Sequence, residues 1–316
     1  MFRDPSRLAS GALLAVLAAA ATAAQQRGPA PDPLVRENAT IKVAPHTFVI
    51  PDGNVGLVPN VGIVVGSRAT LVIDPGLGRP NGETVLTEVA KVSKNAALYI
   101  ATTHFHPEHT TGYVAFPASA KYIDAVAQEA EFEQNGMQMV RTFANRSVVT
   151  ADLLKDAARR PADITFEHEY TLDLGGVRVR FMAVGPTHTR GDTGFFVEGD
   201  GVLFAGDVVM NESFLAANDA SSMAAWLKAF DTFDGLKPST VVPSHGAVGP
   251  GSLIAANRTV MMSIRARAIA LKAQGKSIDE TASTIQSEMT AAHPAWPRAN
   301  GIGAAARSAY NEPQQP

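Results

Sequence analysis

Short apolar runs separated by turn residues are the commonest pattern along this chain, and they predict β-strands. Each run is rich in Val, Ile, Leu or Phe and is bounded by Gly, Pro, Asp or Asn, as strands and their turns usually are. The runs form one block before residue 103 and another after residue 169. They cover residues 47–50, 57–65, 70–73, 97–102, 170–174, 177–184, 193–197, 202–205 and 240–242.

Apolar residues at helical spacing predict helices between and after these runs. In residues 221–233 the apolar positions fall on one face, which is typical of a helix packed on a core. Two strand-rich halves, each with helices, favour an α/β fold in which two sheets pack face to face with helices outside. The predicted helices cover residues 84–92, most of 120–160, 221–233, 253–273 and 278–289.

Length, charge and composition narrow the function classes. The chain has 316 residues, which suits one α/β domain with an N-terminal extension. Its formal net charge is −3, from 27 basic and 30 acidic residues, and no block of like charge indicates a nucleic acid partner. There is no cysteine, which excludes disulfides and thiolate ligands. Any metal must therefore be held by His, Asp or Glu.

The N-terminus has the composition of a secretory signal peptide. Arg3 and Arg7 precede an Ala- and Leu-rich stretch that ends in small residues at 22–24. An uncleaved membrane anchor is the alternative, but the stretch is short and mostly alanine. We expect a periplasmic or secreted protein, without stable membrane insertion after cleavage and without a lipid-bearing cysteine. The expected parts are a signal peptide at 1–24, a flexible lead-in at 25–37, one domain at 38–311 and a disordered tail at 312–316.

Potential metal ligands are most closely spaced in the segment Thr103-His104-Phe105-His106-Pro107-Glu108-His109. His104 and His106 are two residues apart, so on extended backbone both side chains point to the same side. Pro107 restricts its own backbone and that of the residue before it, which favours a sharp turn. Glu108 and His109 then leave the turn on another side. The segment can therefore supply ligands to two metal ions.

Three further ligand-type residues each follow a predicted strand. They are His188, Asp207 and His245. Separate strands that end in such residues can assemble one site at a sheet edge. His46, His168 and His293 have no comparable surroundings and are assigned no role, and Asp192 is expected to stabilise the loop that carries His188.

With these residues in place, the sequence resembles the metallo-β-lactamase superfamily from about Asn60 to Gly246. All five motifs of the family find a match, in order, and the resemblance implies the four-layer αββα sandwich. It also implies the ligands: His104, His106 and His188 for one metal, Glu108, His109 and His245 for a second, and Asp207 between the two. Asp74 would lie behind the ligands and accept hydrogen bonds that hold their loop.

The resemblance further implies a hydrolase with two Zn²⁺ ions, with Fe or Mn as alternatives. A metal-bound hydroxide would attack a small ester, thioester, lactone or lactam, and Asp207 or Glu108 would relay the proton. Glu108 stands where the family normally has Asp, so we expect a looser second site or another metal preference. The fourth motif has Asp207 where many β-lactamases have Cys, which disfavours β-lactam substrates.

Three other functions remain open at this point. They are a β-lactamase proper, an iron-dependent oxidoreductase on the same fold, and a non-catalytic metal-binding protein. The partner is expected to be a small-molecule substrate, and the oligomeric state does not follow from the sequence. Phe132, Met137, Met139 and Phe143 lie between the second and third motifs. We expect them to form a helix core, and we hypothesise that some of them also line an apolar substrate pocket.

Overall fold

The computed structural model describes residues 30–312, so the expected signal peptide and most of the expected tail lie outside the described residues. The described strands form two sheets, one with strand order β1 to β7 and one with order β13-β12-β11-β10-β9-β8. The first contains β1 Ile41–Lys42, β2 Thr47–Ile50, β3 Val61–Val65, β4 Ala69–Ile73, β5 Ala97–Ala101, β6 Lys121–Ala125 and β7 Ile164–Phe166. The second contains β8 Glu169–Asp173, β9 Arg178–Ala183, β10 Thr193–Val197, β11 Val202–Gly206, β12 Thr240–Pro243 and β13 Gly249–Pro250.

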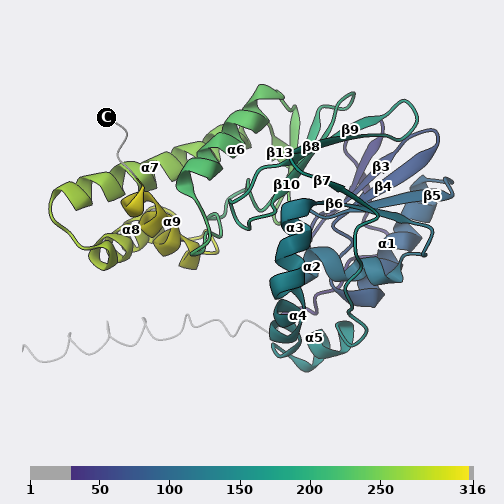
Figure 1. Ribbon diagram of the computed structural model, residues 1–316, viewed down its shortest axis with the longest axis horizontal. Helices are drawn as coiled ribbons and strands as arrows, with labels where there is room; N and C mark the ends of the chain where they lie inside the picture. Colours follow the sequence, from purple (N-terminus) through teal and green to yellow (C-terminus); the bar gives the residue numbers. More distant parts are fainter. Residues whose placement is uncertain (1–29, 313–316) are drawn as a thin grey trace, which may run out of the picture. The chain divides into compact units, whose positions relative to one another are not determined.

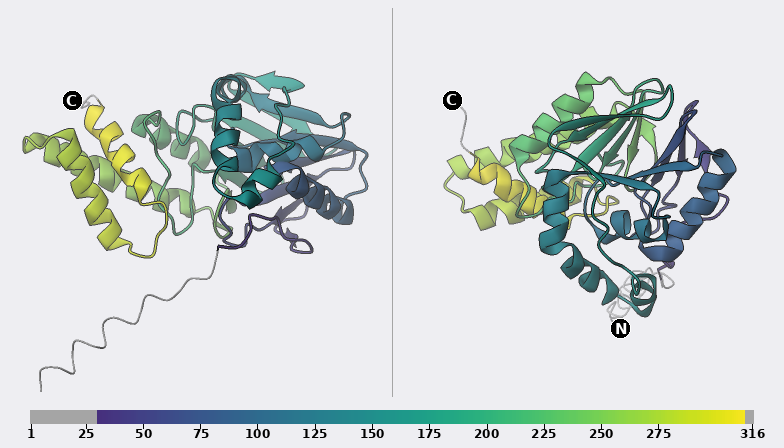
Figure 2. Two further views of the ribbon diagram at one scale, coloured as in Figure 1. Left: turned by 90° about the horizontal axis from the view of Figure 1, so that it is seen from below. Right: turned by 45° about the vertical axis from the view of Figure 1, so that its right-hand side comes forward.

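The two sheets pack face to face through an apolar layer. Leu71 and Ile73 of the first sheet share a buried cluster with Phe181, Phe195 and Phe204 of the second. Alternation along each strand explains this layer, since every second side chain of a strand points to the same face. Figure 2 shows the purple and blue strands of the first sheet beside the teal and green strands of the second.

Helices cover the outer face of each sheet. Helix α1 (Gly78–Val92) buries Val85 and Val89 against the first sheet. Helix α6 (Met223–Gly235) buries Trp226 and Phe230 in the cluster on the outer face of the second sheet. The layers are therefore helix, sheet, sheet and helix, which confirms the predicted αββα class.

Three C-terminal helices pack on one another beside α6 (Figure 1). They are α7 (Leu253–Ala273), α8 (Ile278–Ala292) and α9 (Asn300–Asn311). The first two confirm predicted helices. The sequence did not predict α9, because Gly301 and Gly303 lower its intrinsic helix propensity. Gly301 lies against the backbone of Leu215, where a larger side chain would not fit.

Two predictions of secondary structure were wrong. Residues 121–125 were expected within a helical region but form β6, which pairs in parallel with β5 and β7. A five-residue strand between helices has too short a pattern to be recognised by periodicity alone. The predicted strand 57–65 begins only at Val61.

Part of the expected lead-in is packed rather than loose. The backbone N–H of Val35 donates to Asn81 Oδ1 at 2.7 Å, and Asn81 Nδ2 donates to the Pro33 carbonyl at 2.9 Å. Val35 is buried against the first sheet and α1. Among the helices within residues 30–312, none is both long and apolar enough to cross a bilayer.

Candidate metal centre

The segment after β5 brings two histidines and a short helix to the edge of the first sheet. His106 has extended backbone (φ −63°, ψ 148°) and Pro107 occupies the first turn of α2 (Pro107–Thr110). Proline is well suited to this position because the first turn of a helix leaves its N–H groups unpaired. The turn buries Glu108 and His109 directly behind His106, as the sequence predicted.

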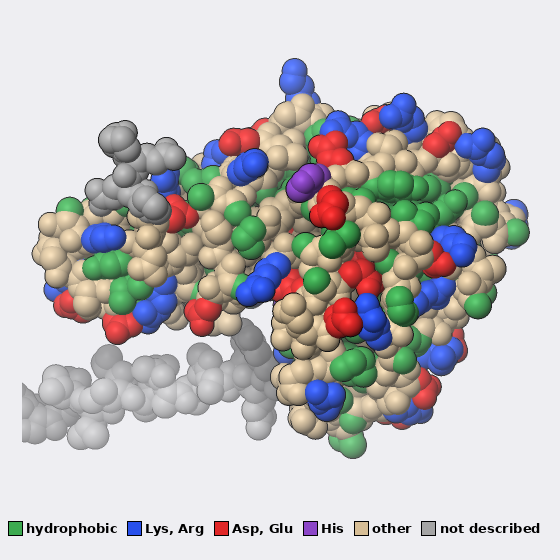
Figure 3. Space-filling view, in the orientation of Figure 1, with side chains coloured by type: hydrophobic (Ala, Val, Ile, Leu, Met, Phe, Trp, Pro, Cys, Tyr) green, Lys and Arg blue, Asp and Glu red, His purple; other side chains and the backbone are tan. Residues whose placement is uncertain are grey.

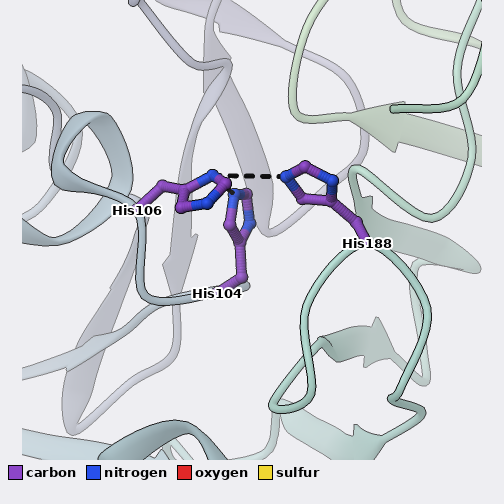
Figure 4. Close-up of side chains that lie close together, drawn as sticks. All are labelled: His104, His106 and His188. Atoms are coloured by element: carbon purple, nitrogen blue, oxygen red, sulfur yellow. Dashed lines mark hydrogen bonds between the residues drawn. The ribbon is translucent and has the colours of Figure 1, made fainter. Parts of the chain in front are cut away.

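Three imidazoles from two loops form a first group. His104 Nε2 lies 3.1 Å from His106 Nδ1, and His188 Nε2 lies 3.2 Å from the same atom. Figure 4 shows His188 reaching the pair from a different part of the chain. The three nitrogens converge as ligands of one metal ion do.

The loop of His188 is held from several sides. His188 Nδ1 lies 2.6 Å from the Ala216 carbonyl, which directs Nε2 towards the other histidines. Asp192 accepts hydrogen bonds from the hydroxyl of Thr187 and from both the N–H and the hydroxyl of Thr189. The prediction that Asp192 stabilises this loop is confirmed.

Helix α3 (Val126–Glu131) braces the same loop and connects it to β5. Glu131 Oε2 accepts from the backbone N–H of Arg190 at 3.0 Å and of Gly191 at 3.1 Å. Gln128 donates from Nε2 to Thr102 Oγ1, next to the His104 segment. A Cβ on Gly191 would come within 2.3 Å of Gln128 Cα, so only glycine allows this approach.

Glu108, His109 and His245 form a second group. His245 follows β12, and its Nδ1 lies 2.9 Å from the Val58 carbonyl. His109 Nδ1 lies 2.9 Å from Asp74 Oδ2. Because Nδ1 of each ring is engaged in these contacts, Nε2 of His109 and of His245 is available to bind a ligand in the centre. Glu108 Oε2 and His109 Nε2 are buried and have no hydrogen-bond partner.

Asp207 lies between the two groups, directly after β11. Its Oδ2 is 3.6 Å from His188 Nε2 and its Oδ1 is 4.0 Å from His245 Nε2. Oδ1 is buried and has no hydrogen-bond partner. One carboxylate therefore faces both groups, which is the position that the sequence assigned to a bridging ligand.

Asp74 lies behind the ligands, as predicted. Its Oδ1 accepts from the N–H of Thr103 at 2.7 Å, and its Oδ2 accepts from the Thr103 hydroxyl at 2.8 Å. Its backbone has φ 56°, in the left-handed region that Asp and Asn tolerate better than most residues. Asp74 thus fixes both the start of the His104 segment and the ring of His109.

Burial and neighbouring charges set the protonation of the centre. Burial and the adjacent imidazoles hold the pKa values of His104 and His106 well below the usual range, and burial lowers that of His245 to about 3. Burial opposes ionisation of Asp207, but Arg298 and the nearby histidines hold its pKa well below normal. Burial would also lower the pKa of His109, yet Asp74 raises it to about 8.

These properties fit a divalent metal ion. The lowered pKa values of His104, His106, His245 and Asp207 keep these side chains in the forms that bind metal, which are neutral imidazole and ionised carboxylate. A metal ion would have to displace a proton from His109, whose pKa is raised. Three buried atoms of the centre lack hydrogen-bond partners: Glu108 Oε2, His109 Nε2 and Asp207 Oδ1. A buried polar atom without a partner costs free energy unless a ligand satisfies it. The donor set of nitrogen and oxygen suits Zn²⁺, Fe²⁺ or Mn²⁺.

Two features of the centre were not predicted from the sequence. Arg298, just before α9, donates from Nη1 to Asp207 Oδ2 at 2.6 Å. Arg146 stacks on Phe143, with its guanidinium carbon 3.6 Å from the ring centroid, and the Phe143 ring lies 6.4 Å from that of His106. No motif marks either arginine. Phe132 packs on Gly136, and Met137 and Met139 pack against the buried cluster that contains Phe143, which agrees with the expected helix core. The hypothesis that some of these residues line a substrate pocket stays a prediction.

Fold and centre together define a two-sheet αββα protein with a buried site of histidines and carboxylates that could hold a metal ion. The family model "Metallo-beta-lactamase superfamily" matches residues 55–245, so the chain belongs to that superfamily. The match contains Asp74 and all seven predicted ligands, and it ends at His245. Arg298 and the three C-terminal helices lie beyond it.

The relatives found by sequence are fungal proteins. The chain is 25% identical over 214 residues to the lactamase-like protein vrtG of Penicillium aethiopicum, covering 66% of this chain and 60% of that protein. It is 23% identical over 189 residues to the lactamase-like protein nscB of Trichophyton equinum, covering 60% of this chain and 48% of that protein. The chain thus spans about half to three-fifths of the length of these relatives.

Solved structures share the fold. A metallo-β-lactamase from Pontibacter korlensis matches 68% of this chain and 94% of its own, with a TM-score of 0.55 and 20% identity. The sec-alkylsulfatase Pisa1 from Pseudomonas sp. matches 86% of this chain and 49% of its own, with a TM-score of 0.64 and 15% identity. At these identities the two structures show a shared fold, and it is membership of the superfamily that supports a metal-dependent hydrolase.

Proposed function

We propose that the protein is an exported hydrolase with two zinc ions that cleaves a small ester, thioester, lactone or lactam. The observation that carries the proposal is the pair of ligand groups on either side of Asp207. A single structural metal ion would need only one such group. Two groups that share a carboxylate fit a dinuclear catalytic site.

The ligands divide between two cations in this proposal. His104, His106 and His188 would hold the first, and Asp207 lies where it could contribute to both. When bound, two divalent cations supply Lewis-acid chemistry, in which water is acidified and a carbonyl oxygen is polarised. The second cation is held by Glu108, His109 and His245.

Two carboxylates are placed to move the proton to the leaving group. Burial raises the pKa of Glu108 in the metal-free protein. Asp207 lies between the two groups, with Oδ2 3.6 Å from His188 Nε2 and Oδ1 4.0 Å from His245 Nε2. The substrate is given room by a cavity of about 420 Å³ beside His245, a volume suited to a small molecule.

A panel of chromogenic esters, thioesters, lactones and β-lactams, assayed on zinc-loaded protein, tests the proposal. We expect hydrolysis of at least one class and a loss of about 10³-fold or more in His106→Ala, since removal of a ligand disables a catalytic metal site. His168→Ala is the matched control, because His168 is exposed and outside the centre. Hydrolysis of no class, or bound iron with oxygen consumption, would refute the proposal.

Export is a separate part of the proposal and rests on residues 1–24 alone. It is tested by expressing the full chain in a Gram-negative host and determining the N-terminus of the protein released by osmotic shock. A mature protein that begins near Gln25 is expected. Full-length protein retained in the cytoplasm would contradict export and would leave the hydrolase proposal unaffected.

A further inference from the structure

A basic side chain reaches the metal centre from the C-terminal helices. Arg298 lies between α8 and α9, and its Nη1 donates to Asp207 Oδ2 at 2.6 Å. Its side chain is 27% exposed, so the guanidinium is shielded on most sides but still open to solvent. This arginine therefore lies within contact distance of the carboxylate that faces both ligand groups.

The backbone of Arg298 is held in an unusual conformation. Its φ is 67°, in the left-handed region that residues other than Gly, Asn and Asp seldom adopt, at a cost of about 1 kcal/mol or more. The neighbouring Pro297 carbonyl accepts from the N–H of Phe214 at 3.2 Å, and Trp296 packs on the Phe214 ring. Strained backbone that the surroundings maintain is concentrated at functional sites.

Most of the hydrogen-bonding capacity of Arg298 is unused. A guanidinium has five N–H donors in one plane, and within residues 30–312 the hydrogen bond to Asp207 is the only one recorded for this side chain. Arg298 also lines the cavity of about 420 Å³, together with His245, Asn211 and Ser213. The remaining donors are therefore available to a molecule in that cavity.

Two carboxylates line the same cavity, but neither is recorded as pairing with Arg298. Asp52 Oδ2 accepts from the N–H of Gly246 at 2.8 Å, and its Oδ1 accepts from the N–H of Asn54 at 3.0 Å. Glu212 is an exposed residue at the rim. Asp52 is thus hydrogen-bonded to the loop of His245, and Asp207 is the carboxylate that forms a direct ion pair with Arg298, while Glu108 and Asp52 act on its pKa from further away.

The kind of ligand that Arg298 would bind depends on the charge of the metal centre. This step rests on the proposed function. Two divalent cations would take up the charge of Asp207 and Glu108 and of Asp74 behind them. Arg298 would then add a further positive charge at the same place. Asp52 and Glu212 also line the cavity and offset part of this positive charge, so the inference rests on the planar guanidinium, whose remaining donors suit two oxygens of one oxyanion.

We propose that Arg298 is a specificity-determining residue that binds a carboxylate or similar oxyanion of the substrate, close to the bond that is hydrolysed. The substrates are then acidic acyl compounds, in which the carboxylate occupies the cavity beside His245 while the scissile carbonyl faces Asp207. Neutral esters of the same size lack this anchor and are poorer substrates.

The test compares two chromogenic esters, 4-nitrophenyl acetate and the mono-4-nitrophenyl ester of succinic acid, on zinc-loaded protein. The wild type should prefer the succinate ester in kcat/KM, and Arg298→Gln should reduce that preference about 10- to 100-fold, the value of one charged hydrogen bond. Arg298→Lys should retain part of it, since lysine keeps the charge but not the planar fork. Damage to the metal centre lowers both rates and leaves their ratio unchanged.

Arg307→Gln is the control, since Arg307 lies in the same helical region and pairs with Asp279. Zinc content is measured for every variant. Calorimetric titration with succinate supplies a readout without catalysis, and the Kd should rise about 10-fold or more in Arg298→Gln. The proposal would be overturned if Arg298→Gln changed the preference for the succinate ester by less than about twofold and bound succinate as tightly as the wild type. Hydrolysis of neither ester would instead count against the proposed function, while the succinate titration would still test Arg298.

Discussion

Substitution of Asp74 by Asn separates the role of its charge from that of its shape. Both residues tolerate the left-handed backbone at this position, whereas Ala would add strain. The asparagine oxygen should face the N–H of Thr103, since the reverse orientation would bring two donors together. The amide NH₂ then faces His109 Nδ1, where Asp74 Oδ2 accepts in the wild type at 2.9 Å.

His109 has two responses to this change, and both weaken metal binding. If Nδ1 keeps its hydrogen, two donors face each other, and the lost charged hydrogen bond costs about 1.5–3 kcal/mol. If the ring changes tautomer, Nδ1 accepts from the amide and Nε2 gains the hydrogen. A protonated Nε2 cannot bind a metal ion. The expected loss of affinity in the Glu108, His109 and His245 group is about 10- to 100-fold.

Calorimetric titration of the metal-free protein with Zn²⁺ measures this effect. In Asp74→Asn we expect one of two binding events to weaken while the other, assigned to the His104 group, changes less. Asp173→Asn is the matched control, because Asp173 lies on an exposed hairpin and pairs with Arg68. Two binding events with wild-type affinities in Asp74→Asn would show that Asp74 does not hold His109 for a metal ion.

The remaining predictions concern the metal ligands and the loops that hold them. Glu108→Asp shortens the side chain beside His109 and His245 by about 1.5 Å and restores the residue that the family normally has, so calorimetry should show a tighter second zinc site than in the wild type; unchanged affinity and stoichiometry would count against the expectation that Glu108 makes this site looser. Glu131→Ala leaves the buried N–H of Gly191 unpaired, so urea unfolding should show a loss of about 1–3 kcal/mol, and an unaltered transition would contradict this bracing role. Since burial lowers the folded-state pKa of His245 from 6.5 to about 3, its stabilising contribution is complete above pH 6.5 and is lost as the pH falls towards 3. As the pH falls through this range, the free energy of unfolding of metal-free protein should decrease by up to about 1.4 kcal/mol per pH unit because of this group. In His245→Asn the free energy of unfolding should depend less steeply on pH than in the wild type, and equal slopes would argue against this role of His245.

The strand pattern and the ligand positions were predictable for a common reason. Each buried strand is a continuous apolar run, and the ligand-type residues His188, Asp207 and His245 follow such runs closely. A strand delivers its last residue to the edge of the sheet whatever the loop beyond it does. The strand pattern and the family resemblance therefore predicted that these side chains meet, and Asp207 lies 3.6 Å from His188 and 4.0 Å from His245 in the structure.

Elements that depend on distant contacts were not predictable. Strand β6 has only five residues, and its strand geometry depends on parallel pairing with β5 and β7. Helix α9 contains two glycines and forms by packing against α7, α8 and the Leu215 backbone. Intrinsic propensity favoured neither, so tertiary packing determined both.

Arg298 shows why the substrate side of a site is harder to predict than its metal side. Metal ligands must be His, Asp or Glu and must follow strands that end together, so both chemistry and topology restrict them. A substrate contact can come from any donor that a loop brings within reach. Arg298 comes from a turn before α9, whose position depends on the packing of three helices that the family match does not include. In this chain the strands therefore position the candidate metal centre, and under our proposal the C-terminal helices supply the residue that selects the charge of the substrate.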